Sequence, residues 1–147
     1  MNQDFKDLLR VFKKEKVRYL IVGGYAVIKH AEPRYTKDLD VWVAADRENA
    51  ERVYRALTEF GAPIADMKPE DFEHEGYFFT MGIAPSRIDI FLGLEQLDFE
   101  ESWEKRVVAT LDNTEIYFIA KDDLIKNKEA IGRLQDLADV EKLKLEK

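Results

Sequence analysis

The sequence predicts an α/β fold of the α+β type, in which a mixed sheet is flanked by helices and the C-terminus is helical. Three observations lead to this prediction. Apolar residues recur at helical spacing within residues 3–15. Short apolar runs of strand character follow, of which residues 38–43 are the clearest. Two stretches of helical character lie within residues 121–145.

The spacing of apolar residues predicts the first helices and the first strand, and glycine and proline residues indicate where they end. In the helix expected over 3–15, four apolar side chains share one face: Phe5, Leu8, Leu9 and Phe12. The apolar run over 17–22 is typical of a strand, and the glycine pair Gly23-Gly24 of a turn after it. A helix is expected over 25–31. It ends before Pro33, because proline disfavours helical backbone in the residue before it.

The central elements are a strand and a capped helix. Residues 38–43 alternate in polarity, which predicts a second strand. Asp46 can cap a helix over 46–59, and Gly61 ends it. The polar segment that follows contains one expected helical turn near 69–72.

Two hairpins are expected in the second half of the chain. Strands over 77–83 and 87–92 are joined by a turn that contains a proline. After a helix over 98–105, strands over 107–111 and 115–119 are joined by an Asp-Asn-Thr turn. These pairs complete the expected sheet.

Two helices, over 121–130 and 133–145, complete the expected elements and are hinged near Gly132. We expect residues 1–147 to form a single domain. The length fits one domain, and no repeat, low-complexity segment or Gly/Ser linker divides the chain.

Composition narrows the function classes. The chain is 46% hydrophobic and 36% charged, as in an ordinary globular protein. It contains no cysteine, which excludes disulfides and thiolate chemistry. A net charge of −7 argues against broad, sequence-independent binding to nucleic acid. No apolar run approaches the ~20 residues that span a bilayer, and the first residues lack the features of a secretory signal. We therefore expect a cytoplasmic protein without membrane association.

Three carboxylates are embedded in the expected strands. Asp38 and Asp40 point to the same side of their strand, ~6.6 Å apart along the chain, because side chains alternate between faces. Asp89 lies between two apolar residues in the same manner. If its strand neighbours that of Asp40, the three acids converge. Such a triad can hold two divalent ions, and Mg²⁺ suits carboxylate oxygens.

A phosphate-binding arrangement precedes the acids. The pair Gly23-Gly24 lets the backbone approach a phosphate closely, and the following helix directs free N–H groups at it. The residues match neither a Walker A loop nor a G-x-G-x-x-G fingerprint. Arg34, Thr36 and Lys37 could add contacts to a triphosphate.

Together these residues resemble a known superfamily. The pattern of Gly23-Gly24, an Asp-x-Asp pair at Asp38 and Asp40, and a distant Asp89 is similar to that of polymerase-beta-type nucleotidyltransferases. The segment from Arg34 to Asp40 looks most like the small members near the AbiEii-type toxins. The tail is similar to their closing helices in Asp123-Leu124-Ile125-Lys126-Asn127-Lys128, Gly132-Arg133 and Asp136-Leu137-Ala138-Asp139. The resemblance spans residues 17–140.

The resemblance implies the nucleotidyltransferase fold and an activity. The activity is transfer of a nucleoside monophosphate from a nucleoside triphosphate to a hydroxyl acceptor, with release of pyrophosphate. Asp38 and Asp40 would hold two Mg²⁺ ions, while Asp89 would hold one of them and activate the acceptor hydroxyl. The expected nucleotide-binding residues are Gly23, Gly24, Tyr25, Arg34, Thr36, Lys37 and Lys128. An RNA 3′ end, a protein side chain or a small hydroxylated molecule could be the acceptor, and the resemblance favours the RNA end or the protein side chain.

Other functions stay open at this point. One is a component of a toxin–antitoxin pair that works chiefly by binding a partner protein. Another is a member of the fold that has lost activity and only binds nucleotide. The three intact acids favour an enzyme, because a pure binding module has no need for converging carboxylates.

Several residues also have purely structural interpretations. Lys128 and Arg133 can pair with acids on the last helix, at Asp136 or Asp139. Arg87 can balance the charge of Asp89. The aromatic residues Tyr77, Phe78 and Phe79 are expected in the core, with stacking of one ring on a base as the alternative. Trp42, on the face of the acids, is the better candidate for stacking. His30 and His74 are expected to be surface or packing residues.

Overall fold

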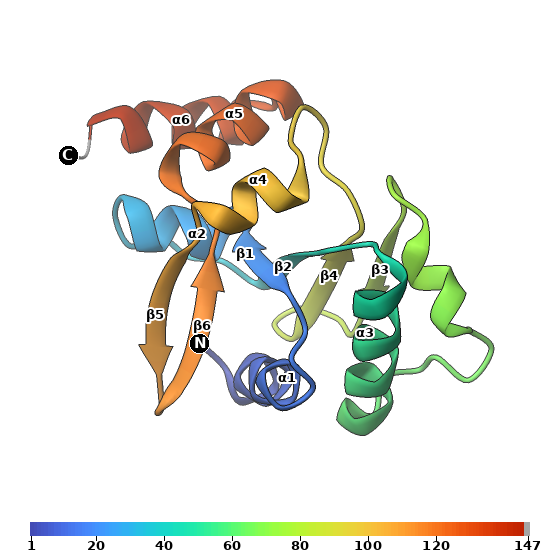
Figure 1. Cartoon of the computed structure of the whole chain (residues 1–147). Helices are drawn as coiled ribbons and strands as arrows, with labels where there is room; N and C mark the ends of the chain where they lie inside the picture. The colour runs from blue at the N-terminus through green and yellow to red at the C-terminus, as the bar shows by residue number, and fades with distance from the viewer. Residues whose placement is uncertain (146–147) are drawn as a thin grey trace.

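The computed structural model describes residues 1–145, which form a mixed six-stranded sheet with flanking helices (Figure 1). The strands are β1 (Tyr19–Val22), β2 (Asp38–Val43), β3 (Phe78–Met81), β4 (Arg87–Phe91), β5 (Val107–Leu111) and β6 (Thr114–Phe118). The α-helices are α1 (Gln3–Lys14), α2 (Gly23–His30), α3 (Arg47–Phe60), α4 (Phe99–Glu104), α5 (Lys121–Ile131) and α6 (Leu134–Leu145). A short 3₁₀ helix, η1, spans Pro69–Glu73. The predicted fold class is confirmed.

The strand order brings the predicted acids of β2 and β4 next to the last residue of β1. The sheet runs β3-β4-β2-β1-β6-β5, with β2 parallel to β4 and antiparallel to β1. Asp40 is therefore opposite Asp89 on one side and Val22, the last residue of β1, on the other. The expected neighbourhood of the Asp38 and Asp89 strands is confirmed.

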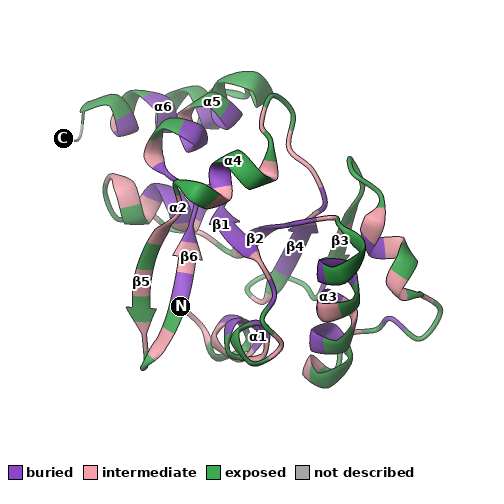
Figure 2. Cartoon of the chain, in the orientation of Figure 1, coloured by how far each residue is buried: buried purple, intermediate pink, exposed green. Residues whose placement is uncertain are grey.

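One face of the sheet is packed against α1 and α3. Leu39 and Val41 are completely buried, and Tyr19 of β1 contacts Phe12 of α1 with ring centroids 5.4 Å apart. Figure 1 shows α1 and α3 below the sheet, with α2, α4, α5 and α6 gathered above it. Buried residues follow the sheet and the inner sides of these helices (Figure 2).

Helix ends follow the caps expected from the sequence. The Asp46 side chain accepts a hydrogen bond from the Asn49 amide and begins α3, and Gly61 ends it in the left-handed conformation at φ 92°. Helix α2 starts at Gly23, two residues before its expected start. The glycine pair is thus the first turn of α2 and not a turn ahead of it.

Two predictions about aromatic residues are wrong. Tyr77 and Phe78 are 65% and 62% exposed, because β3 is an edge strand, so they do not belong to the core. Trp42 does lie on the face of the acids, but it is only 2% exposed and packs edge-on against Phe99 of α4 at 5.1 Å. It is therefore not free to stack on a base.

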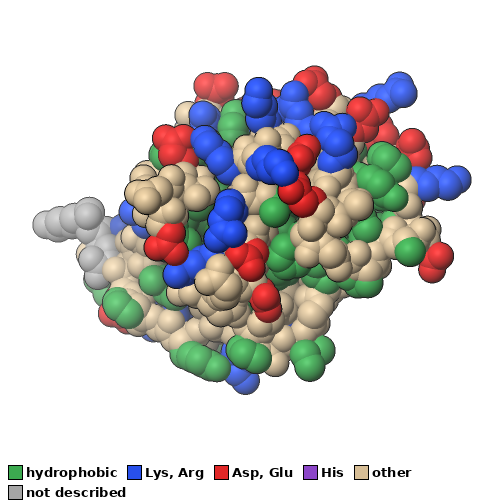
Figure 3. All heavy atoms as spheres, turned by 90° about the horizontal axis from the view of Figure 1, so that it is seen from below, with side chains coloured by type: hydrophobic (Ala, Val, Ile, Leu, Met, Phe, Trp, Pro, Cys, Tyr) green, Lys and Arg blue, Asp and Glu red, His purple; other side chains and the backbone are tan. Residues whose placement is uncertain are grey.

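The surface carries charges of both signs. On the face shown in Figure 3, Lys and Arg side chains lie interspersed with Asp and Glu. This agrees with the absence of a net positive charge on the chain. Within residues 1–145, no helix is long and apolar enough to cross a membrane.

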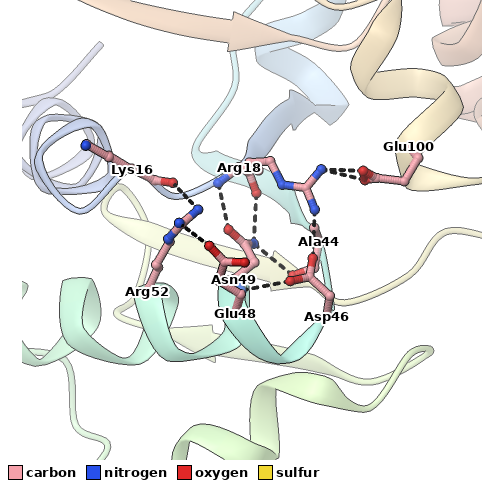
Figure 4. Close-up of polar contacts among 8 residues, drawn as sticks. All are labelled: Lys16, Arg18, Ala44, Asp46, Glu48, Asn49, Arg52 and Glu100. Atoms are coloured by element: carbon pink, nitrogen blue, oxygen red, sulfur yellow. Dashed lines mark hydrogen bonds and ion pairs between the residues drawn. The ribbon is translucent and has the colours of Figure 1, made fainter.

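A buried asparagine connects β1 to α3 (Figure 4). Asn49 is 1% exposed; its Oδ1 accepts from the Arg18 amide at 2.8 Å, and its Nδ2 donates to the carbonyls of Arg18 at 3.1 Å and Ala44 at 2.8 Å. The Arg18 side chain extends outward to Asp46 and Glu100. Asn49 thus holds the start of β1 and the end of β2 together.

We predict that Asn49→Ala lowers the free energy of unfolding by about 2–4 kcal/mol, because three hydrogen bonds in a dry site are lost. Glu100→Gln is the matched control, since it weakens only an exposed ion pair and should cost at most about 1 kcal/mol. Urea denaturation measures both values. Equal effects of the two substitutions would contradict a structural role for Asn49.

Candidate active site

An open pocket of about 620 Å³ lies where β1, β2 and β4 meet. It is lined by residues of the β1–α2 junction, the segment before β2, strands β2 to β4, and helices α5 and α6. The lining includes nine of the ten site residues predicted from the sequence: Gly23, Gly24, Arg34, Thr36, Lys37, Asp38, Asp40, Asp89 and Lys128. The tenth, Tyr25, packs edge-on against Phe5 of α1 at 5.8 Å. Segments far apart in the chain thus converge on one cavity.

Asp40 and Asp89 are direct neighbours across β2 and β4. Burial, followed by the negative charges of Asp89 and Asp38, raises the pKa of Asp40 to about 7. Asp89 is 7% exposed, and its Oδ1 accepts hydrogen bonds from Thr80 Oγ1 at 2.8 Å and from Arg87 Nε at 3.1 Å. The charge balance between Arg87 and Asp89 that the sequence offered is confirmed. The site concentrates negative charge in a partly dry place.

The acids are not arranged as a complete metal cage. Among residues 1–145, no three His, Cys, Asp or Glu side chains are placed together so that they could hold a metal ion. The guanidinium of Arg87 lies against Asp89, where it supplies the positive charge that the neighbouring carboxylates need. Asp40 and Asp89 form the close pair, and Asp38 stands opposite Arg87 in the register.

Both positions of the pair Gly23-Gly24 require glycine, because side chains of neighbouring segments lie very close to the backbone there. Gly23 has φ 64°, and a Cβ built on it would lie 2.2 Å from Oδ2 of Asp40. A Cβ on Gly24 would lie 2.6 Å from Oγ1 of Thr36 and 3.1 Å from the Arg34 guanidinium. Helix α2 has no side-chain cap at its N-terminus. Its first N–H groups therefore favour an anion at this end of the pocket.

Helices α5 and α6 add a buried cation. Lys128 is 4% exposed, and its Nζ lies 3.1 Å from both Asp136 Oδ1 and Asp139 Oδ2. Arg133 Nε donates to Asp136 at 2.6 Å, and Arg34 reaches Asp139 at 3.4 Å. The predicted pairing of Lys128 and Arg133 with these acids is confirmed. Both cations nevertheless line the pocket.

The hydrogen bonds from Arg133 and Lys128 keep Asp136 ionised. Burial alone would raise the pKa of Asp136, but hydrogen bonds from Arg133 and Lys128 hold it below its usual value. The positive charge of Lys128 also opposes the rise in the pKa of Asp40. Cations from the C-terminal helices thus act directly on the acid cluster.

Sequence reasoning missed several lining residues. Phe78, Phe91 and Gln135 line the pocket, as does the exposed Tyr35. The signal for Phe91 was its position two residues after Asp89, on the same face of the strand. Phe78 required knowledge of the β3–β4 register, in which it is opposite Phe91.

This fold and this cluster of acids, glycines and cations define a nucleotidyltransferase of the polymerase-beta type. The chain belongs to the family described as "Nucleotidyltransferase of unknown function (DUF6036)", whose model matches residues 2–147. A search of curated proteins finds no match to the chain. The narrower resemblance to AbiEii-type toxins stays a prediction.

Solved structures show the same fold at low sequence identity. The lincosamide antibiotic adenylyltransferase LnuA, lincomycin-bound, has a TM-score of 0.58 and 16% identity, over 98% of this chain and 96% of that one. A putative nucleotidyltransferase from Thermotoga maritima has a TM-score of 0.61 and 16% identity, over 94% and 88%. An antigenic nucleotidyltransferase-like protein from Paracoccidioides brasiliensis has a TM-score of 0.55 and 13% identity, over 92% and 70%.

We predict that Asp40→Asn stabilises the metal-free protein at pH 8. With a pKa raised to about 7, Asp40 favours the folded state when protonated and loses that contribution as the pH rises through 7. The amide is neutral at every pH, so the advantage of the variant should shrink as the pH falls from 7 toward 4. Denaturation in EDTA measures it, with Asp66→Asn at an exposed carboxylate as the control. A less stable Asp40→Asn protein at pH 8 would contradict the destabilising effect that burial and the neighbouring carboxylates have on the charged Asp40.

Proposed function

We propose that this chain is a Mg²⁺-dependent enzyme that transfers a nucleoside monophosphate from a nucleoside triphosphate to a hydroxyl group of an acceptor, releasing pyrophosphate. The observation that carries the proposal is the placement of Asp40 beside Asp89, with Asp38 on the same strand face, opposite a glycine-initiated helix. A nucleotide-binding protein without chemistry would have no use for this costly pair of acids.

The carboxylates of the pocket have the donor chemistry for divalent cations, and a change in side-chain positions would bring three of them to one ion. Hard carboxylate oxygens are the ligands that Mg²⁺ prefers, and a bound cation would offset the burial and the neighbouring negative charges that raise the pKa of Asp40. Asp38 and Asp40 would hold two ions and Asp89 one of them, once Arg87 moves from Asp89. When bound, the ions stabilise the attacking and leaving oxygens of an in-line displacement.

The opposite end of the pocket fits the triphosphate. Helix α2 begins at the pocket without a side-chain cap, so its first N–H groups can bind a phosphate, and Gly24 lets Thr36 and Arg34 approach the start of the helix closely. Lys128 and Arg34 add positive charge that Asp136 and Asp139 hold in place. Lys37 lines the rim and can contact an outer phosphate.

In the reaction, Asp89 accepts the proton of the acceptor hydroxyl. The hydroxyl oxygen forms a bond to the α-phosphorus, the bond from that phosphorus to the bridging oxygen breaks, and pyrophosphate leaves with the electron pair. Lys128 and the α2 N-terminus hold the pyrophosphate as its charge develops. Thr80 keeps the Asp89 carboxylate oriented toward the acceptor.

Among acceptors, the proposal favours a small hydroxylated molecule over an RNA end or a protein side chain. LnuA, which shares the fold over nearly its whole length, is an adenylyltransferase for lincosamide antibiotics. ATP is accordingly the first donor to test. Incubation with each α-labelled nucleoside triphosphate, Mg²⁺ and total cell extract shows whether label enters small molecules, RNA or protein. Transfer to none of them would contradict the proposal.

Asp89→Asn should lower transfer by roughly a thousandfold, because the base for the hydroxyl proton is lost, while nucleotide affinity changes little. Turnover, nucleotide affinity and melting temperature of this variant and of Arg87→Ala separate the two roles of Asp89. If Asp89 only balances Arg87, both variants will lose stability together and Asp89→Asn will turn over like the parent.

Gly24→Ala should abolish the rise in melting temperature that Mg²⁺ and ATP give to the parent, because the added Cβ would displace Thr36 and the Arg34 guanidinium from the phosphate-binding end of the pocket. Differential scanning fluorimetry with and without Mg²⁺–ATP provides the comparison. The variant without ligand serves as the control for folding. An unchanged response to nucleotide would mean that the glycine pair has no part in binding.

A further inference from the structure

Two aromatic rings form one wall of the pocket beside the acids. Phe78 of β3 and Phe91 of β4 are opposite each other in the register, with ring centroids 5.8 Å apart and planes inclined by 28°. Phe78 is 62% exposed, and both rings line the pocket. A large exposed ring stacked on a second ring offers a flat apolar surface to a ligand.

These rings lie across the acids from the phosphate-binding end. The strand order β3-β4-β2-β1 places Phe78 and Phe91 beyond Asp89, whereas Gly23 follows β1 on the far side of Asp40. In an in-line displacement the attacking and leaving oxygens lie on opposite sides of the phosphorus. Because the leaving pyrophosphate is held at the glycine end, the acceptor must enter from the side of the two rings.

The charge around the rings narrows the class of acceptor. Residues 66–75, which include η1, contain five carboxylates and one lysine. Asp71 of this segment lines a second hollow of about 320 Å³ that adjoins the other side of Phe78. On this side of Phe78 the carboxylates disfavour a phosphate backbone and accept a neutral or positively charged molecule.

We infer that Phe78 and Phe91 form the acceptor platform, and that the acceptor is a neutral or cationic small molecule that presents a flat apolar ring face next to its reactive hydroxyl. The inference rests on the proposed function, in which Asp89 receives the hydroxyl proton. The ring lies on Phe78 and brings the hydroxyl to Asp89. The platform thereby selects ring compounds, and the carboxylates beside it disfavour a polynucleotide.

Three matched glycosides test the platform by saturation-transfer NMR without nucleotide. Phenyl β-D-glucoside carries a flat ring and no charge, methyl β-D-glucoside lacks the flat ring, and phenyl β-D-glucuronide adds a negative charge. We expect saturation of the phenyl protons of the glucoside, at least fivefold weaker signals for the methyl glucoside, and weakening of the glucuronide signal. Equal signals for all three would overturn the inference.

Three variants at two rings, Phe78 and Tyr77, locate the binding. Phe78→Ala should weaken phenyl glucoside binding by roughly fivefold, and Phe78→Trp should retain it, because stacking depends on the flat face. Tyr77→Ala is the matched control, since Tyr77 is as exposed as Phe78 but lines the adjoining hollow. Loss of binding in Tyr77→Ala but not in Phe78→Ala would place the ring away from the acids and overturn the inference.

Calorimetry on the same variants measures their affinity for Mg²⁺–ATP. This affinity tests the proposed nucleotidyl transfer independently of the acceptor platform. We expect Phe78→Ala to bind Mg²⁺–ATP like the parent. A loss of ATP affinity in this variant would show that the rings hold the donor base, which overturns the acceptor assignment. Ring binding by a parent chain that binds no Mg²⁺–ATP would refute the proposed function and leave only a ring-binding surface.

Discussion

The repulsion between Asp40 and Asp89 is the constraint on which the site depends. Two neighbouring strands run parallel in a register that sets these carboxylates side by side, with Asp89 buried and Asp40 partly exposed to the pocket. Burial and the neighbouring charges raise the pKa of Asp40 to about 7, far from an ordinary carboxyl. A fold that keeps such a pair needs positive charge nearby, and each cationic element of the pocket supplies part of it.

The C-terminal helices supply part of the positive charge that Asp40 and Asp89 need, although they are distant from both acids in the sequence. Lys128 on α5 is buried between two acids of α6, and its charge acts on Asp40 of β2. Helix α2 begins with Gly23, where a side chain would collide with Asp40. The sheet, the first turn of α2 and the closing helices are therefore fitted to one charge cluster, and the family model spans all of these elements, over residues 2–147.

Most elements and the acids could be predicted from the sequence because their signals are local. Alternation in β2, the Asp46 cap and Gly61 fixed bounds to within about two residues. The side-chain environment of Trp42, Tyr25 and Phe78 could not be predicted, because it depends on which distant element packs on each ring. Trp42 is covered by α4, Tyr25 by α1, and Phe78 by nothing on the open side of an edge strand.

The central claim is that the acid cluster binds divalent ions together with a nucleotide. Electron paramagnetic resonance of Mn²⁺ tests it directly, because free and bound Mn²⁺ give distinct signals. With a non-hydrolysable ATP analogue, the parent chain should bind two Mn²⁺ ions per molecule. Asp40→Asn, with its fold intact, should leave most of the Mn²⁺ free. Equal Mn²⁺ binding by parent and variant, or none by the parent, would contradict the account.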